Sequence, residues 1–168
     1  MPSALNALLW ALAALAAALY GALAYGSFVT MPSLAGGILG FDMRPFGMSG
    51  ARGGIYLSAM TEAGRDYYVN WLKPVDTVFI GTLTTLLLLL AFKLRRWRGW
   101  LIAVSASAYA AFDLLENLLV SSLITHGAKS STSDFVQTIA MFTTGKFLSL
   151  AIALIALKLA WRSAHAQR

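Results

Sequence analysis

The sequence contains no cysteine, so it has no disulfide and no thiol chemistry of its own. Charged residues are also scarce, because Asp, Glu, Lys and Arg make up only 12% of the chain, about half their share in a soluble domain. The only histidines, His126 and His165, lie outside the long apolar runs. A haem or a metal ion held by histidine within a membrane is therefore not expected, and we predict neither a metal site nor a cofactor.

The chain consists largely of long apolar runs, and 58% of its residues are hydrophobic. A transmembrane helix needs about 20 such residues, so 168 residues leave no room for a separate soluble domain. We predict an all-α fold, a single polytopic four-transmembrane-helix bundle over residues 1–168, with spans at about 4–31, 74–92, 100–123 and 135–160. The first run carries no charge and is too long for the core of a signal peptide, which predicts a retained helix.

The net charge of +6 is concentrated at the ends of the predicted spans. Short loops rich in Lys and Arg stay in the cytoplasm, which predicts a multi-pass protein of the bacterial cytoplasmic (inner) membrane with both termini cytoplasmic. Membrane lipid is then the expected partner, and nucleic acid is not. The residues concerned lie in the linker after the second span and in the tail: Lys93, Arg95, Arg96 and Arg98, then Lys158, Arg162 and Arg168.

The outer segment 32–73 changes character along its length. Its first half contains many glycines, whereas its second half, from about Tyr56 to Leu72, has helical spacing with aromatic residues. Tyr and Trp are enriched at membrane interfaces, so we expect one or two short helices along the outer surface. Pro74 then begins the second span, because proline fits the first turn of a helix.

Small residues recur every four positions in the first span. Such rows let membrane helices approach closely, either within the bundle, which we favour, or across a homo-oligomer formed through the first helix. The rows are Ala14, Ala18, Ala22 and Gly26, and Ala13, Ala17 and Gly21.

Ionisable groups lie inside the third and fourth spans. Tyr109, Asp113, Glu116 and Asn117 follow the i, i+4, i+7, i+8 rule and share one helix face. A charge near the centre of a membrane helix costs roughly 2.5–3.5 kcal/mol, so Lys146 in the fourth span is predicted to pair with Asp113 or Glu116.

Two carboxyl groups beside one lysine suit acid–base chemistry or proton coupling. We therefore treat Glu116, Asp113 and Lys146 as candidate catalytic residues, with Asn117, Tyr109 and Thr143 as candidate ligand-binding residues. The alternative is structural, because buried ion pairs and Asn hydrogen bonds can simply fix the register of two helices.

Four short segments resemble a pattern found in small uncharacterised bacterial four-helix integral membrane proteins. They are GRxxY at 64–68, Asp76 at the second helix, DxxEN at 113–117 and TxxK at 143–146. The resemblance implies that Arg65, Tyr68 and Asp76 belong to the same ligand-binding site, and it implies no reaction. We further predict that the outer segment folds back as a lid with Arg65 paired to Asp76; otherwise Arg65 lies on an exposed helix and meets lipid phosphate.

Two classes of function fit these features. The first is a small membrane enzyme or binding protein whose cavity opens to the outer leaflet and takes a lipid-like amphiphile. The second is a proton-coupled transporter or channel unit, which would need polar residues continuing to the inner surface. A third, supported only by the small-residue rows, is an accessory subunit of a larger membrane complex.

Overall fold

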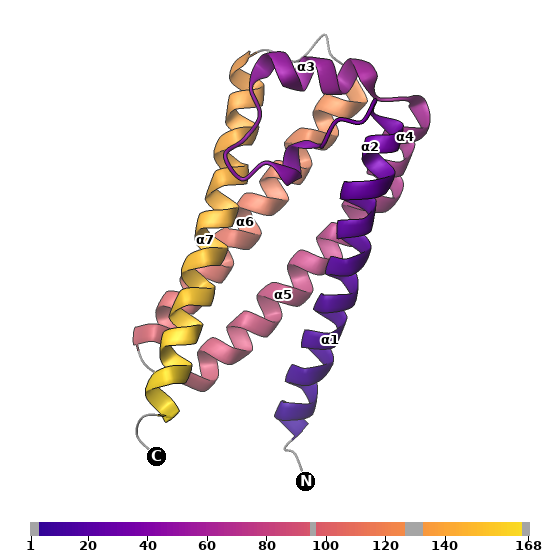
Figure 1. Ribbon diagram of the computed structural model, residues 1–168. Coiled ribbons are helices and arrows are strands. Elements are labelled where there is room, and N and C mark those ends of the chain that lie inside the picture. The colour runs from indigo at the N-terminus through magenta and orange to yellow at the C-terminus, as the bar shows by residue number, and fades with distance from the viewer. Residues whose placement is uncertain (1–3, 95–96, 127–132, 166–168) are drawn as a thin grey trace.

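The computed structural model describes residues 4–94, 97–126 and 133–165, and this part of the chain is helical without any strand (Figure 1). Four of its helices are long and apolar enough to cross a membrane: Ala4–Leu34, Glu62–Leu94, Trp97–His126 and Asp134–Arg162. The predicted all-α architecture with four candidate transmembrane helices is therefore observed. It is consistent with a multi-pass membrane protein.

The two N-terminal long helices each contain a wider, π-helical turn. The first comprises α1 (Ala4–Tyr25), η1 (Gly26–Thr30) and α2 (Met31–Leu34), and the second comprises α4 (Glu62–Tyr67), η3 (Tyr68–Leu72) and α5 (Lys73–Leu94). The second helix thus begins at Glu62, and the prediction that Pro74 begins it is wrong. Much of the segment expected to form separate surface helices is instead the first part of this long helix.

A proline explains each wide turn. Proline has no N–H, and its ring clashes with the carbonyl one helical turn earlier. Pro32 and Pro74 each lie two residues beyond a π-helical turn, in which the N–H of Met31 donates to Gly26 O and that of Lys73 to Tyr68 O. This i to i+5 bonding widens the helix just before the proline, so the helix continues through it.

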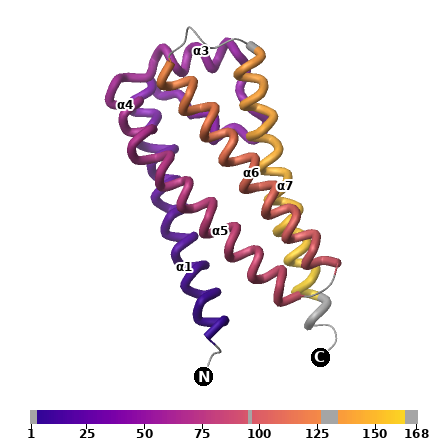
Figure 2. Tube along the Cα trace, turned by 180° about the vertical axis from the view of Figure 1, so that it is seen from behind, coloured from indigo at the N-terminus to yellow at the C-terminus, as the bar shows by residue number. Residues whose placement is uncertain are grey.

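The bundle has two different ends (Figures 1 and 2). Both termini of the described chain lie at one end, here called the terminal end, as an even number of crossings requires. Helix α3 (Gly50–Ala59) crosses the opposite end, here called the α3 end. Arg95, Arg96, Arg168 and most of the short loop between the last two helices lie outside the described residues.

Helices α6 (Trp97–His126) and α7 (Ser133–His165) pack side by side along their length. One run of buried positions on α6 is spaced alternately by four and three residues, which is the spacing of a coiled-coil seam. Asp113 and Glu116 occupy two of these positions, opposite Thr143 and Lys146 on α7. The positions with this spacing are Ile102, Ala106, Tyr109, Asp113, Glu116, Val120 and Leu123, and further buried residues of α6 lie beside them: Gly99, Ser105, Asn117, Ser121 and Ile124.

The outer segment folds back onto the α3 end of the bundle. It passes from α2 to α7 through a short 3-10 turn, η2 (Phe41–Met43), and then rises to α3 (Figure 1). Thr144 Oγ1 donates to Pro45 O at 3.1 Å. Gly47 has a φ of +78°, and a Cβ there would lie 2.2 Å from Ala140 Cβ, so only glycine fits this contact.

Two apolar cores lie at different heights. The core at the α3 end joins the outer segment to the long helices through large side chains such as Phe41, Tyr56, Leu72 and Ile124. The core at the terminal end is smaller and packs α5, α6 and α7 through Leu87, Ala91, Ile102, Ala106, Ala153 and Ala156.

Candidate functional site

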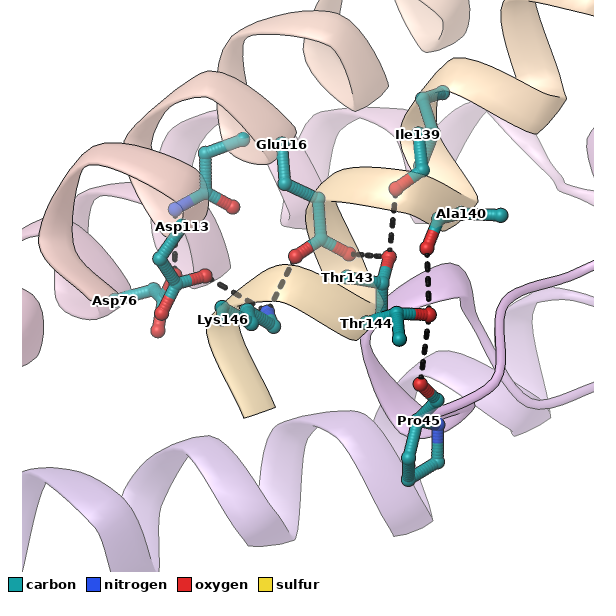
Figure 3. Close-up of polar contacts among 10 residues, drawn as sticks. Pro45, Asp76, Asp113, Glu116, Ile139, Ala140, Thr143, Thr144 and Lys146 are labelled. Atoms are coloured by element: carbon teal, nitrogen blue, oxygen red, sulfur yellow. Dashed lines mark hydrogen bonds and ion pairs between the residues drawn. The ribbon is translucent and has the colours of Figure 1, made fainter. Parts of the chain in front are cut away.

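A buried ion cluster joins α6 to α7 between the two cores. Lys146 Nζ lies 2.7 Å from Asp113 Oδ1 and 2.5 Å from Glu116 Oε2 (Figure 3). The Lys146 side chain is 9% exposed, Asp113 4% and Glu116 0%. The prediction that Lys146 pairs with Asp113 or Glu116 is confirmed, and it pairs with both.

Thr143 completes the environment of Glu116. Its hydroxyl donates to Glu116 Oε1 at 2.6 Å and also lies 3.0 Å from Ile139 O, one turn earlier on the same helix. A hydroxyl has a single proton, so these two acceptors compete for it. Both oxygens of Glu116 are thus engaged, one by the threonine and the other by the lysine.

A second polar pair joins α5 to α6. Asn117 Nδ2 donates to Asp76 Oδ2 at 2.5 Å, so Asp76, which the resemblance assigned to the site, does lie beside the polar stripe of α6. Burial in a poorly hydrated environment penalises a carboxylate without partners. The amide therefore satisfies one oxygen of Asp76, while Asp76 Oδ1 has no hydrogen bond or ion pair within the described chain.

These groups line one end of a cavity of about 300 Å³. Asp76, Tyr109, Asp113, Asn117 and Lys146 belong to its polar lining, as do Asp42, Lys73, Ser27 and Tyr68. Glu116 binds Lys146 and does not line the cavity. The apolar part comes mainly from the first and second long helices, with Phe147 and Leu150 from α7. The residues that line the cavity are Tyr20, Leu23, Ala24, Ser27, Phe28, Asp42, Met43, Pro45, Tyr68, Leu72, Lys73, Asp76, Phe79, Tyr109, Asp113, Asn117, Lys146, Phe147 and Leu150.

The cavity reaches the surface of the bundle between α1 and α7. Pro45 in the lining is exposed, and so are three of its aromatic side chains, Tyr20 at 62%, Phe28 at 55% and Phe147 at 38%. The three aromatic residues mark the opening. They belong to α1, η1 and α7, the two long helices on either side of the front face in Figure 1. An apolar molecule in contact with that face would meet these aromatic side chains first.

Arg65 lies elsewhere than predicted. Its Nη1 donates to Ile124 O at 2.8 Å and its Nη2 to Leu57 O at 3.0 Å, so it pairs with neither Asp76 nor any other carboxylate. The last four carbonyls of a helix have no helical donor, and Ile124 and Leu57 lie in the last turns of α6 and α3. Arg65 therefore ties two helix ends together, and its predicted pairing with Asp76 is wrong.

Tyr68, by contrast, does line the cavity. It is 3% exposed, and its hydroxyl has no hydrogen-bond partner among the described residues. It belongs to the wide turn η3, where the helix departs from regular α-helical spacing. A helix predicted to begin at Pro74 does not include Tyr68, so the sequence did not indicate which way the Tyr68 side chain faces.

Asp42 is a further acidic residue at the cavity, and the sequence analysis did not select it. It comes from η2 in the glycine-rich half of the outer segment, and its Oδ1 is buried without a hydrogen-bond partner in the part of the chain that the structure describes. Burial raises the pKa of this carboxyl; nearby Lys146 opposes the rise, and Asp113 adds to it. The one sequence signal was an aspartate between two apolar residues, Phe41 and Met43, which is unusual for an exposed loop.

The small-residue rows of the first helix divide along its length. Gly26 is buried, and a Cβ there would lie 2.8 Å from Leu72 Cδ1, so the first two long helices approach closely at this level. Ala14, Ala18 and Gly21 are exposed in the described chain. Of the small residues in these rows, Gly26, which lies nearest the α3 end, is therefore the one that packs closely within the bundle.

The described residues contain no group of three or more His, Cys, Asp or Glu side chains placed to hold a metal ion. No protein-family model, curated protein or solved structure matches this chain. The resemblance to small bacterial four-helix membrane proteins therefore stays a prediction.

Proposed function

We propose that this chain is a membrane protein that binds a lipid-like amphiphile in the cavity between α1 and α7. One observation carries the proposal. The exposed part of the cavity lining consists of aromatic side chains and Pro45, whereas its buried part includes Asp113, Asn117 and Lys146. Ligand sites typically have apolar walls with a few polar groups that fix orientation. An amphiphile has the same division between tail and head.

The size of the cavity agrees with this use. About 300 Å³ lies at the lower end of the range for small-molecule sites, which is enough for a headgroup and part of a chain. The remainder of the chain would leave between Tyr20, Phe28 and Phe147 into the surrounding lipid. A water-soluble ligand would not readily enter by this opening, because in a membrane the side of the bundle faces lipid and only its two ends face water.

The chemistry of the polar end suggests distinct roles. Asp113 and Lys146 face the cavity and would contact the headgroup, whereas Glu116 holds Lys146 from behind and can exchange a proton through it. Asn117 would orient the head, since its amide is already fixed by Asp76. If the protein is an enzyme, Lys146 and Asp113 are the groups that would touch its substrate.

The same proposal includes an orientation in the bacterial inner membrane. Both termini would be cytoplasmic and the α3 end would face outward, because the linker and tail carry the basic residues. Since the chain lacks cysteine, single variants Gly54→Cys and Trp97→Cys can be labelled with a membrane-impermeant maleimide in intact cells. We expect labelling of Gly54→Cys alone, and labelling of Trp97→Cys alone would reverse the orientation.

The alternatives receive less support. A proton pathway would need ionisable side chains towards the terminal end, but the buried polar residues described there are only the hydroxyls of Thr82, Ser105 and Ser149. An accessory or self-associating role would use the exposed small residues of α1, including Ala14 and Ala18. These alanines are compatible with a partner helix, but they do not select one.

Filling the cavity tests the proposal. Ala24 lines the cavity on α1, so Ala24→Phe should expel a bound amphiphile, whereas Ala17→Phe on an exposed part of the same helix should not. Purified wild type and both variants would be extracted, and their lipids identified and quantified by mass spectrometry. Enrichment of one amphiphile class in wild type and Ala17→Phe, with loss in Ala24→Phe, is expected. The same lipid profile in all three proteins would contradict binding in the cavity.

A further inference from the structure

Carboxylates outnumber lysines around the cavity. Lys146 is already held between Asp113 and Glu116, so its charge is neutralised before any ligand arrives. Lys73 lines the cavity but forms no ion pair with a described residue. The acids are Asp42, Asp76, Asp113 and, behind the lining, Glu116, against the two lysines Lys73 and Lys146.

Two of the acids have no cationic partner within the described chain. Asp76 receives one hydrogen bond from Asn117, and Asp42 Oδ1 is buried without any. They come from α5 and from η2, two elements that meet at this cavity. Carboxylates removed from water and left without a cation are costly, and a ligand cation would relieve that cost.

Tyr68 supplies an independent observation. Its side chain is 97% removed from solvent, being 3% exposed, and its unpartnered hydroxyl belongs to the lining of the same cavity. A buried hydroxyl without a partner is rare in native proteins, because the loss of hydrogen bonding to water is not recovered. The phenol oxygen and Asp42 Oδ1 are both acceptors, so an N–H donor would satisfy both.

The aromatic character of the lining is compatible with the same ligand. Aromatic ring faces attract cations, most strongly where water is excluded. A phosphate headgroup, by contrast, would meet uncompensated carboxylates and no free lysine except Lys73. The aromatic lining residues are Tyr20, Phe28, Tyr68, Phe79, Tyr109 and Phe147.

We infer that the cavity selects a protonated long-chain amine, with Asp42 and Asp76 as its anionic partners and Tyr68 as a further hydrogen-bond acceptor. This inference rests on the proposed amphiphile binding and names the headgroup. The amine's N–H groups supply donors to Asp42 Oδ1, to the Tyr68 hydroxyl oxygen and to the one oxygen of Asp76 that Asn117 does not bind. Its alkyl chain runs along the aromatic wall towards the opening between α1 and α7.

The affinity for the amine should depend on pH. Because burial raises the pKa of Asp42, its carboxylate takes up a proton at a higher pH than an exposed aspartate would. A protonated Asp42 loses its attraction for an ammonium group, so binding should weaken as pH falls through the raised pKa and be strongest above it. The groups that face Asp42 are Lys146 on α7, Asp113 and Glu116 on α6, Asp76 on α5, Tyr68 on η3 and Tyr56 on α3.

Three probes with the same chain length test the headgroup. Dodecylamine, 1-dodecanol and dodecanoate would compete at equal concentration for protein in a neutral maltoside detergent, with bound ligand counted by native mass spectrometry. The variants are Asp42→Asn, Asp76→Asn and Tyr68→Phe, and Glu62→Gln is the control because Glu62 is an exposed acid remote from the lining. Asn at position 76 can still accept the hydrogen bond from Asn117, so that variant should fold.

We expect wild type and Glu62→Gln to prefer the amine over the alcohol at least tenfold, and each aspartate variant to lose about tenfold of that preference, since a hydrogen-bonded charge is removed. Tyr68→Phe should lose a few-fold. Equal retention of amine and alcohol, or an amine preference unchanged in both aspartate variants, would overturn the headgroup assignment while leaving amphiphile binding intact. Retention of none of the probes by the wild type would overturn both proposals.

Discussion

The two ends of the α6–α7 seam differ although the same two helices form both. On one face of α7, Lys146 lies two turns from Ala153, and both are buried. Around Lys146 the seam holds two carboxylates, a threonine and an adjoining cavity, whereas around Ala153 it holds uncharged side chains, mainly alanine, leucine and isoleucine. The bundle thus confines its buried charge to the half that the outer segment covers.

This difference bears on whether the cluster is a site or a structural element. A single polar residue in a coiled-coil seam is enough to fix its register. Asp113, Glu116, Thr143 and Lys146 exceed that need, and Asp76 adds a further acid beside a cavity. The cluster therefore can fix the register and serve a ligand at once, and the two roles can be separated by experiment.

The largest effect should come from removing the lysine alone. Lys146→Met leaves Asp113 and Glu116 buried without their cation and should destabilise the protein by about 3–5 kcal/mol. The combined variant Lys146→Met, Asp113→Asn, Glu116→Gln removes all three charges and should recover most of that loss. Reversible unfolding in mixed micelles measures both. A triple variant as unstable as the single one would show that packing, and not the unpaired charges, causes the loss.

An intermediate effect is expected at the terminal end. Ala153 is fully buried in the small-residue core, so Ala153→Phe should overpack it and destabilise the protein by about 1–3 kcal/mol. The cavity should be untouched, because it does not include this residue. The molar ratio of co-purified amphiphile to folded protein should then equal that of the wild type. A lower ratio would mean that the two ends are coupled.

The sequence predicted four long helices and the polar stripe of α6 correctly, but it did not predict the side-chain contacts at the α3 end. Helical spacing correctly placed Asp113, Glu116 and Asn117 on one face, because α6 is regular throughout. The predicted pairing of Arg65 with Asp76 is wrong, because both residues belong to one long helix that begins at Glu62 and not at Pro74. The position of Asp42 depends on the path of a glycine-rich connection that has no periodicity.

The cavity itself could not be predicted. The cavity exists because α1 and α7 are separated, and no sequence pattern in either helix predicts the distance between them. Hydropathy identified four spans because apolar length is a local property of sequence. The space between two non-adjacent spans depends instead on side chains such as Leu72 and Phe79 from the helix that separates them.

The smallest change in stability is expected for Glu116→Gln. The glutamine amide can donate to Thr143 Oγ1 while its oxygen stays near Lys146, and the threonine proton can shift to Ile139 O. The free energy of unfolding should therefore change by less than about 1 kcal/mol. Amphiphile retention should fall, because Lys146 loses one of the two carboxylates that fix it beside the cavity. Thermal stability and co-purified lipid would be measured on the same sample, and unchanged values for both would return Glu116 to a purely structural role.

The paired π-helical turns also determine which changes in chain length each helix can tolerate. A turn closed by an i to i+5 bond contains one residue more than an α-helical turn, so each long helix is out of phase by about 100° across it. Deleting a single residue within Gly26–Thr30 or Tyr68–Leu72 would rotate everything on one side of the turn by that angle. A deletion after Tyr68 in the second helix would stop Tyr68 and Asp76 from facing the cavity together, although no side chain at the ion cluster had been altered. In these two helices the number of residues, as well as their identity, determines what the cavity contains.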